Sequence, residues 1–301
     1  MKFKTLLTAT AAACLVSTAA SAANPPTSPP TLPASCAVFG NQAAFQTALV
    51  SALKGAVGYS GNNGLGFNMW ATVVGNDGAV CAVAFSGNVY TDQWLASRVI
   101  SAQKAATANS LSLAGVSGAS SAGQFAFASG NLYSADREGG SLFGLQFSNP
   151  VNPVNAYGRN GALSTAPDPT TFGTTSDPMI GLPIGGVNVF GGGLALYNSA
   201  GQKVGGLGVS GDTSCTDHYV AWRTRNSLKL DYLKTGNING PAGAFAGDTT
   251  HPDNLIFDIP NNSVKVGPGG TPIEGNNAIS PSGFGHPQCY HQPTGTLPVV
   301  E

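Results

Sequence analysis

A glycine-rich segment, residues 184–220, constrains the fold more than any other part of the chain. It reads IGGVNVFGGGLALYNSAGQKVGGLGVSGDTSCTDHYV. Turn residues at 198–201 separate two strand-like stretches, and the second, 203–209, is so rich in glycine that another group must approach its backbone closely. Ser214 and Asp217 have the spacing of a capping box, with the carboxylate at the positive end of the helix dipole. The segment therefore predicts strand, turn, strand and a glycine-rich step into a helix.

The first 22 residues have the features of a secretory signal peptide. Lys2 and Lys4 form a basic start, residues 6–16 are apolar, and residues 20–22 (ASA) form a small-residue cleavage site. The apolar stretch is too short to span a membrane, and no later segment approaches the required length. We therefore expect an exported protein, periplasmic or secreted, without a membrane span.

Four cysteines follow this leader, and an even number in an exported chain favours disulfides. Cys36 and Cys289 lie in irregular ends, whereas Cys81 and Cys215 lie in expected regular structure. Three pairings are possible, and the economical one fastens each end to the core, as Cys36–Cys81 and Cys215–Cys289. A metal or redox centre would favour closer spacing such as C-x-x-C, which the chain lacks.

The composition excludes a nucleic-acid partner. Only 9% of the residues are charged, the net charge is −1, and the chain has no cluster of Lys and Arg. With 41 Gly and 20 Pro, it is instead typical of a loop-rich exported protein.

The order of predicted elements indicates the fold class. A Pro-rich linker (23–36) precedes a helix at 42–57, two strands at 67–74 and 79–85, and a helix at 92–109. Both strands are apolar throughout, which is typical of a sheet covered on both faces. With the strand pair of the glycine-rich segment, this predicts an α+β fold, an antiparallel sheet of about four to five strands flanked by helices.

Two long segments have little expected regular structure. Residues 110–188 are dominated by Gly, Ser, Asn and Pro, which indicates a binding lid or an insertion. The helix after the glycine-rich step is expected to reach about residue 233. An irregular C-terminal extension, 234–301, follows it, with one strand-like run at 255–259.

Four segments together resemble a known family. They are MWATVVGNDGAVCAVAFSG, SRVISAQKAATA, GGSLFGLQFSNP and FGGGLALYNSAGQKVGGLGVSGDTSCTD. In this order they are similar to the small haem-binding or haem-degrading family called GlcG-like, over about 67–231 with an insertion near 150–182. The resemblance implies a domain at 37–233, assembly into a homo-oligomer, and a small-molecule ligand, haem.

The resemblance also implies site residues. Lys104 matches the family's helix lysine, Gly191, Gly192 and Gly193 match its triple glycine, and the G-V-S-G step ending in Asp217 supplies Gly208, Ser210 and Gly211. His218 stands where relatives often have an acidic residue, and Glu138-Gly139-Gly140 stands where they have Pro-Gly-Gly. These departures affect the ligand more than the fold.

A haem site needs an apolar slot, donors for the propionates and usually an axial ligand. The backbone N–H groups at 208–214 are candidates to donate hydrogen bonds to a carboxylate of the ligand. The alternative is that these glycines only permit a tight turn. Arg98, Lys104 and Arg137 are candidate propionate partners, or else solvated cations. His218 is the candidate iron ligand, because a helix N-terminus favours the neutral imidazole; a capping role is the alternative.

The sequence gives less support to a metal cluster or to a catalytic motif. His286 and His291 flank Cys289, but a metal cluster there requires a reduced thiol. The chain has no G-x-S-x-G, H-E-x-x-H or P-loop motif, and no catalytic residue is assigned. We therefore expect an exported haem-binding protein: a carrier, buffer or sensor accessory, with or without haem degradation. The alternatives are a periplasmic enzyme or accessory protein acting on a small oxygenated metabolite, and a ligand-free structural or assembly module.

Overall fold

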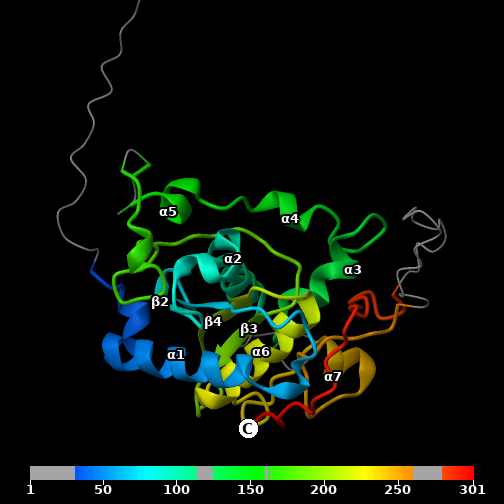
Figure 1. Ribbon diagram of the computed structural model, residues 1–301. Helices are drawn as coiled ribbons and strands as arrows, with labels where there is room; N and C mark the ends of the chain where they lie inside the picture. The colour runs from blue at the N-terminus through cyan, green and yellow to red at the C-terminus, as the bar shows by residue number, and fades with distance from the viewer. Residues whose placement is uncertain (1–30, 114–124, 160–161, 164, 260–279) are drawn as a thin grey trace, which may run out of the picture.

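The computed structural model describes residues 31–113, 125–159, 162–163, 165–259 and 280–301. The signal peptide and most of the linker lie outside these ranges. Four antiparallel strands form one sheet in the order β2-β1-β4-β3, with helices on both faces (Figure 1). The α+β prediction is confirmed. The strands are β1 Trp70–Gly75, β2 Val80–Phe85, β3 Gly193–Tyr197 and β4 Lys203–Ser210.

Side-chain alternation along the strands divides the core into two layers. On β1, Ala71 and Val73 join the larger cluster, whereas Trp70 and Val74 join the cluster on the opposite face. All six residues of β1 are buried, as expected for a central strand covered on both sides.

Helix α2 (Leu95–Leu111) covers one face, and α1 (Gln42–Val57) and α6 (Ser214–Ser227) cover the other (Figure 1). Figure 1 also shows α3, α4 and α5 in sequence along the outer side of α2. The remaining helices are α3 Tyr133–Asp136, α4 Leu145–Ser148, α5 Pro153–Tyr157 and α7 Pro241–Ala246, with short 3-10 turns at Ala34–Phe39, Ser60–Asn62, Tyr90–Asp92, Ser129–Leu132 and Pro169–Thr171.

The expected bounds of two helices differ from the structure, and α2 also runs to Leu111 where its end was expected at 109. Helix α2 begins at Leu95 rather than 92, because the Asp92 carboxylate accepts the N–H groups of Asn88 and Val89 and holds a preceding 3-10 turn. Helix α6 ends at Ser227 rather than near 233, because Lys229 adopts a positive φ of 56°. The chain then runs beside β3, where the Tyr197 N–H donates to the carbonyl of Leu230.

The C-terminal extension is built into the core rather than laid on it. Leu297 and Val300 belong to the larger hydrophobic cluster, and the indole N–H of Trp222 on α6 donates to the Pro298 carbonyl at 2.9 Å. The run at 255–259 forms no strand; Ile256 makes an isolated bridge to Gly285. Most of the described extension is irregular, yet it completes the hydrophobic core.

Both disulfides of the economical pairing are present, Cys36–Cys81 and Cys215–Cys289. The first joins the lead-in to β2, and the second joins the start of α6 to the extension. Among the described residues, no helix has the length and apolar character required to cross a bilayer.

Candidate functional site

The glycine-rich step from β4 into α6 is packed against the protein itself. Gly206 and Gly208 alternate with the core residues Leu207 and Val209, so they present bare backbone to helix α2. A Cβ on Gly208 would overlap the carbonyl oxygen of Ser101, and one on Gly206 would overlap that of Ala105. The close neighbour that these glycines predicted is therefore α2, and they leave no room for a guest molecule on this face.

The other predicted glycines are enclosed in the same way. A Cβ on Gly191 would meet the Ser214 carbonyl oxygen, and one on Gly192 would meet that of Val209. A Cβ on Gly193 would meet the carbonyl oxygen of Lys104. Gly211 is closed by the Asn68 backbone and the Gln93 side chain, and Ser210, the last residue of β4, is itself buried. A role of these residues as ligand contacts stays a prediction. A ligand could reach them only if α2 or the surrounding loops moved.

Lys104 and Asp217 form a buried ion pair. The Lys104 Nζ lies 2.7 Å from Oδ2 of Asp217 and 3.1 Å from the Val209 carbonyl oxygen. The other carboxylate oxygen, Oδ1, accepts the Asp212 N–H at 2.8 Å. Burial raises the pKa of Asp217 to about 6 and lowers the pKa of Lys104, effects that their pairing opposes. The pair fastens α2 to the first turn of α6, so Lys104 is not free to meet a propionate in this structure.

Arg98 is also occupied. Its guanidinium forms a buried bidentate pair with Asp177 and stacks over the Phe172 ring at 4.0 Å. Both partners belong to the expected insertion, so Arg98 anchors that segment to α2. Arg137, by contrast, is exposed and donates to the Tyr133 hydroxyl at 2.6 Å.

His218 is fully buried in the first turns of α6. Among the described residues, neither ring nitrogen has a partner within hydrogen-bond geometry, and the nearby Asn254 side chain only partly opposes the effect of burial on the ring. Burial lowers the pKa of His218 to about 3, with a smaller contribution from nearby Arg225, so the ring is neutral near pH 7. A neutral, unpartnered imidazole fits the prediction of a metal ligand, but its enclosure means that iron has no open path to it.

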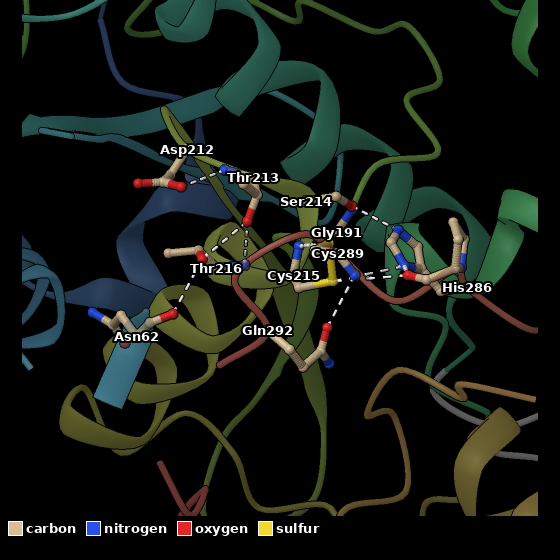
Figure 2. Close-up of a disulfide and its surroundings, with 11 residues drawn as sticks. Asn62, Gly191, Asp212, Thr213, Ser214, Cys215, Thr216, His286, Cys289 and Gln292 are labelled. Atoms are coloured by element: carbon tan, nitrogen blue, oxygen red, sulfur yellow. Dashed lines mark hydrogen bonds between the residues drawn. A yellow bond between two sulfur atoms is a disulfide. The ribbon is translucent and has the colours of Figure 1, made fainter. Parts of the chain in front are cut away.

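The start of α6 meets the extension around the second disulfide (Figure 2). The Ser214 Oγ lies 2.7 Å from Nε2 of His286, and the His286 Nδ1 lies 2.6 Å from the Pro287 carbonyl oxygen. The Cys215 N–H donates to the Cys289 Sγ at 3.1 Å. Sequence reasoning placed His286 beside Cys289 but did not bring it to Ser214. The disulfide pairing was the available signal, because it draws the H-P-Q-C run to the first turn of α6.

The same disulfide removes the thiolate ligands that a metal site around Cys289 would need. Cys215, His286 and Cys289 place their ligand atoms within 4.8 Å of one another. Both thiols are consumed in the S–S bond, so neither offers a thiolate to a metal. His291 lies on the exposed loop beyond.

A surface hollow lies at the far end of the glycine-rich step. It has a volume of about 310 Å³ and is walled by α6's first turn and by the loop between α1 and β1. Exposed aromatic side chains flank it: Phe67 meets Trp94 edge-on, with ring centroids 5.3 Å apart. The Arg223 guanidinium stacks on the Tyr59 ring at 3.9 Å. The lining residues are Val57, Gly58, Tyr59, Ser60, Asn62, Asn63, Gly64, Gly66, Phe67, Met69, Asp212 and Thr216.

The buried histidines predict a pH-dependent stability. Burial lowers the pKa of His218 to about 3 and of His286 to about 4, both below the value near 6.5 of an unfolded chain. As the pH falls below 6.5, the two histidines therefore become protonated in the unfolded state but stay neutral in the folded state. From pH 7 to 5.5 each histidine should lower the free energy of unfolding by about 1 kcal/mol, with Asp217, whose pKa is raised, offsetting part of this loss.

Urea unfolding at a series of pH values measures this trend. The variant His286→Gln should show clearly less than half of the wild-type decline over the same range, because one histidine loss is removed while the Asp217 offset stays. A wild-type stability that stays level from pH 7 to 5.5 would contradict the assignment of neutral buried rings.

Comparisons with known proteins add little to this geometry. No family model matches the chain, and no curated protein matches it. The crystal structure of Klebsiella pneumoniae protein ORFY (DUF336) is 20% identical, covers 60% of this chain and 88% of its own, and has a TM-score of 0.36. The crystal structure of a PduOC:heme complex is 18% identical, covers 60% and 89%, and has a TM-score of 0.37. Both scores are too low for either likeness to carry an argument.

Proposed function

We propose that this chain is an exported haem-binding protein of the GlcG-like type, a carrier, buffer or sensor accessory. The proposal is motivated by the four sequence segments that resemble that family and by the α+β architecture they form. Two disulfides and the leader-like N-terminus support export to the periplasm or beyond.

The hollow beside Tyr59 carries the proposal, because the glycine step does not fit a haem in this structure. Tyr59 is exposed, and a phenolate is a known axial ligand for haem iron. Phe67 and Trp94 offer an apolar surface for a porphyrin. The Arg223 guanidinium is a cation beside Tyr59, but it already donates to the Tyr219 and Thr296 carbonyl oxygens and would have to exchange one of these bonds for a propionate. Bound haem would supply an iron centre suited to carriage or redox sensing.

The volume of the hollow decides how such a ligand sits. At about 310 Å³ it lies at the lower end of the 300–1,000 Å³ typical of ligand pockets. A tetrapyrrole would therefore insert one edge and lie otherwise over Phe67 and Trp94. We expect a partly exposed haem rather than an enclosed one.

A haemin titration followed by absorbance tests the proposal. The full chain should give a saturable Soret band, and Tyr59→Phe should change the band and weaken binding about tenfold or more, a loss of about 1.4 kcal/mol. Tyr157→Phe, on the exposed side of α5, is the matched control and should leave the band unchanged. No band above that of an unrelated protein would overturn haem binding, whereas an unaltered band in Tyr59→Phe would overturn only the ligand assignment.

The same volume favours a second candidate, a small oxygenated metabolite in the same hollow. Its lining includes the polar residues Asn62, Asn63 and Thr216. Thermal-shift screening separates the two, since a ligand at one hundred times its Kd stabilises by about 2.7 kcal/mol. A chain stabilised by neither class of ligand would support the ligand-free module instead.

The predicted homo-oligomer also stays a proposal. Phe143 and Phe147, around α4, are largely exposed and give the outer side of the molecule an apolar character. Sedimentation of the intact chain tests for association, and Phe147→Ser should shift the equilibrium toward the monomer. A wild-type monomer at high protein concentration would contradict the oligomer.

A further inference from the structure

Ser214 occupies a position in the fold that differs from that of an ordinary surface serine. It is the first residue of α6, reached from β4 by the short step Gly211-Asp212-Thr213. Thr213 performs the N-cap, its side chain accepting the Thr216 N–H, so the Ser214 hydroxyl is not needed for capping. This strand–turn–helix arrangement leaves Ser214 partly exposed at the positive end of the helix dipole.

The hydrogen bonds around Ser214 define where each proton lies. The Pro287 carbonyl oxygen can only accept, so the His286 Nδ1, at 2.6 Å, must carry a hydrogen. His286 is almost fully buried and neutral, so its Nε2 is bare and accepts the Ser214 hydroxyl at 2.7 Å. The Gly191 N–H donates to the Ser214 Oγ at 2.6 Å (Figure 2).

We propose that Ser214 and His286 are a nucleophile and general base that transfer the acyl group of small carboxylic esters to water. The three groups occupy the roles that nucleophilic catalysis requires: a hydroxyl, a base within hydrogen-bond reach, and a third group that fixes the tautomer of the base. The Pro287 carbonyl takes the orienting role that a carboxylate has in the familiar triad.

The orientation of His286 is held from several sides. Its backbone N–H donates to the Ile256 carbonyl at 2.7 Å, and its ring packs near those of Tyr133 and Phe257. The Cys215–Cys289 disulfide ties this part of the extension to the first turn of α6. The base is therefore placed by the fold before any substrate arrives.

The proposed reaction proceeds in two balanced steps. The Ser214 Oγ attacks the ester carbonyl carbon, its proton moves to Nε2 of His286, and the C–O bond to the leaving alcohol breaks as that alcohol takes the proton. A water molecule then gives a proton to Nε2 and attacks the acyl-serine, and the carboxylic acid leaves as Oγ recovers the proton. The helix N-terminus favours the negative charge that develops on the carbonyl oxygen.

The surroundings limit the substrate to small esters. Phe190 is exposed and precedes Gly191, whose N–H donates to the Ser214 Oγ, so the Phe190 backbone lies beside the nucleophile. Ser214 is only partly exposed, which disfavours bulky acyl groups.

Covalent labelling of the purified full chain tests the proposal. A fluorophosphonate probe should add its mass to the peptide containing Ser214, and the chain should hydrolyse p-nitrophenyl acetate above the buffer rate. Ser214→Ala should abolish both, and His286→Asn should slow hydrolysis about 100-fold or more. Ser148→Ala, an exposed serine on α4 that bonds only Leu145 and the neighbouring Asn149, is the matched control and should leave both unchanged.

A purely structural role of the Ser214–His286 hydrogen bond predicts different results. In that case Ser214→Ala would lower stability, while the wild-type chain would show neither label nor hydrolysis; this outcome overturns the proposal. Mapping the label on the wild-type chain keeps the test decisive even where Ser214→Ala fails to fold. Haemin binding at the Tyr59 hollow should survive blocking of Ser214 by the probe, so failure of either proposal is visible separately.

Discussion

Replacing Asp253 by alanine is expected to lower the free energy of unfolding by about 3–5 kcal/mol. Asp253 holds the Arg225 guanidinium with both carboxylate oxygens, at 2.6 and 2.9 Å, and both side chains are fully buried. The alanine variant would leave a buried positive charge without its partner. Urea unfolding of the two proteins measures the difference.

The exposed pair Lys229–Glu301 provides the control in the same extension. Both side chains are substantially exposed, so Glu301→Gln should change stability by less than about 1 kcal/mol. An Asp253→Ala loss as small as this would show that the extension is not part of the cooperative fold. The predicted difference instead makes the described part of the extension around Asp253 a contributor to the cooperative fold.

Gly208→Ala is expected to destabilise the protein by about 3 kcal/mol or more, at or beyond the upper end of ordinary overpacking. The added methyl would overlap the Ser101 carbonyl oxygen and crowd the Ala105 backbone N–H, both on helix α2. Neither is the end of a flexible side chain, so the helix itself must shift. Thermal and urea unfolding both report the loss.

Gly55→Ala separates this contact from the general effect of removing a glycine. Gly55 lies inside α1, and a Cβ there meets nothing within 4 Å. That variant should be neutral or more stable by about 0.5–1 kcal/mol, because alanine is the better helix former. Equal effects of the two substitutions would mean that the glycines of β4 are not required by α2.

The sequence was sufficient for the fold where local patterns determine structure. The helix expected at 42–57 is α1 (Gln42–Val57), since its apolar spacing ends at a glycine. The two apolar strands around 75–78 pair as β1 and β2, because that turn allows a tight hairpin. The disulfide pairing followed from which cysteines lay in loose ends.

The candidate site was less predictable, because its contacts join residues far apart in sequence. Lys104 and Asp217 are 113 positions apart, and nothing in either segment indicated that they neutralise each other. Arg98 finds its partner Asp177 inside the long irregular segment, where no periodic pattern exists. The glycines correctly indicated a close approach, but the approaching group is the chain's own helix α2.

The extension shows the same limit. Residues such as Leu297 and Val300 lie in a stretch without strand or helix signals, so their burial could not be inferred from periodicity. The Ser214–His286 contact likewise depends on how this stretch folds back on α6.

Hydrogen exchange with and without haemin, followed by mass spectrometry, measures where haem binds on the chain. We expect haemin to slow exchange in residues 57–69 and 212–216, around the Tyr59 hollow, and to leave helix α2 and strand β4 as protected as before. Changes confined to residues 98–109 and 191–211 would contradict this expectation, because they would show that the ligand enters between the glycine-rich strand and the helix that fills its face.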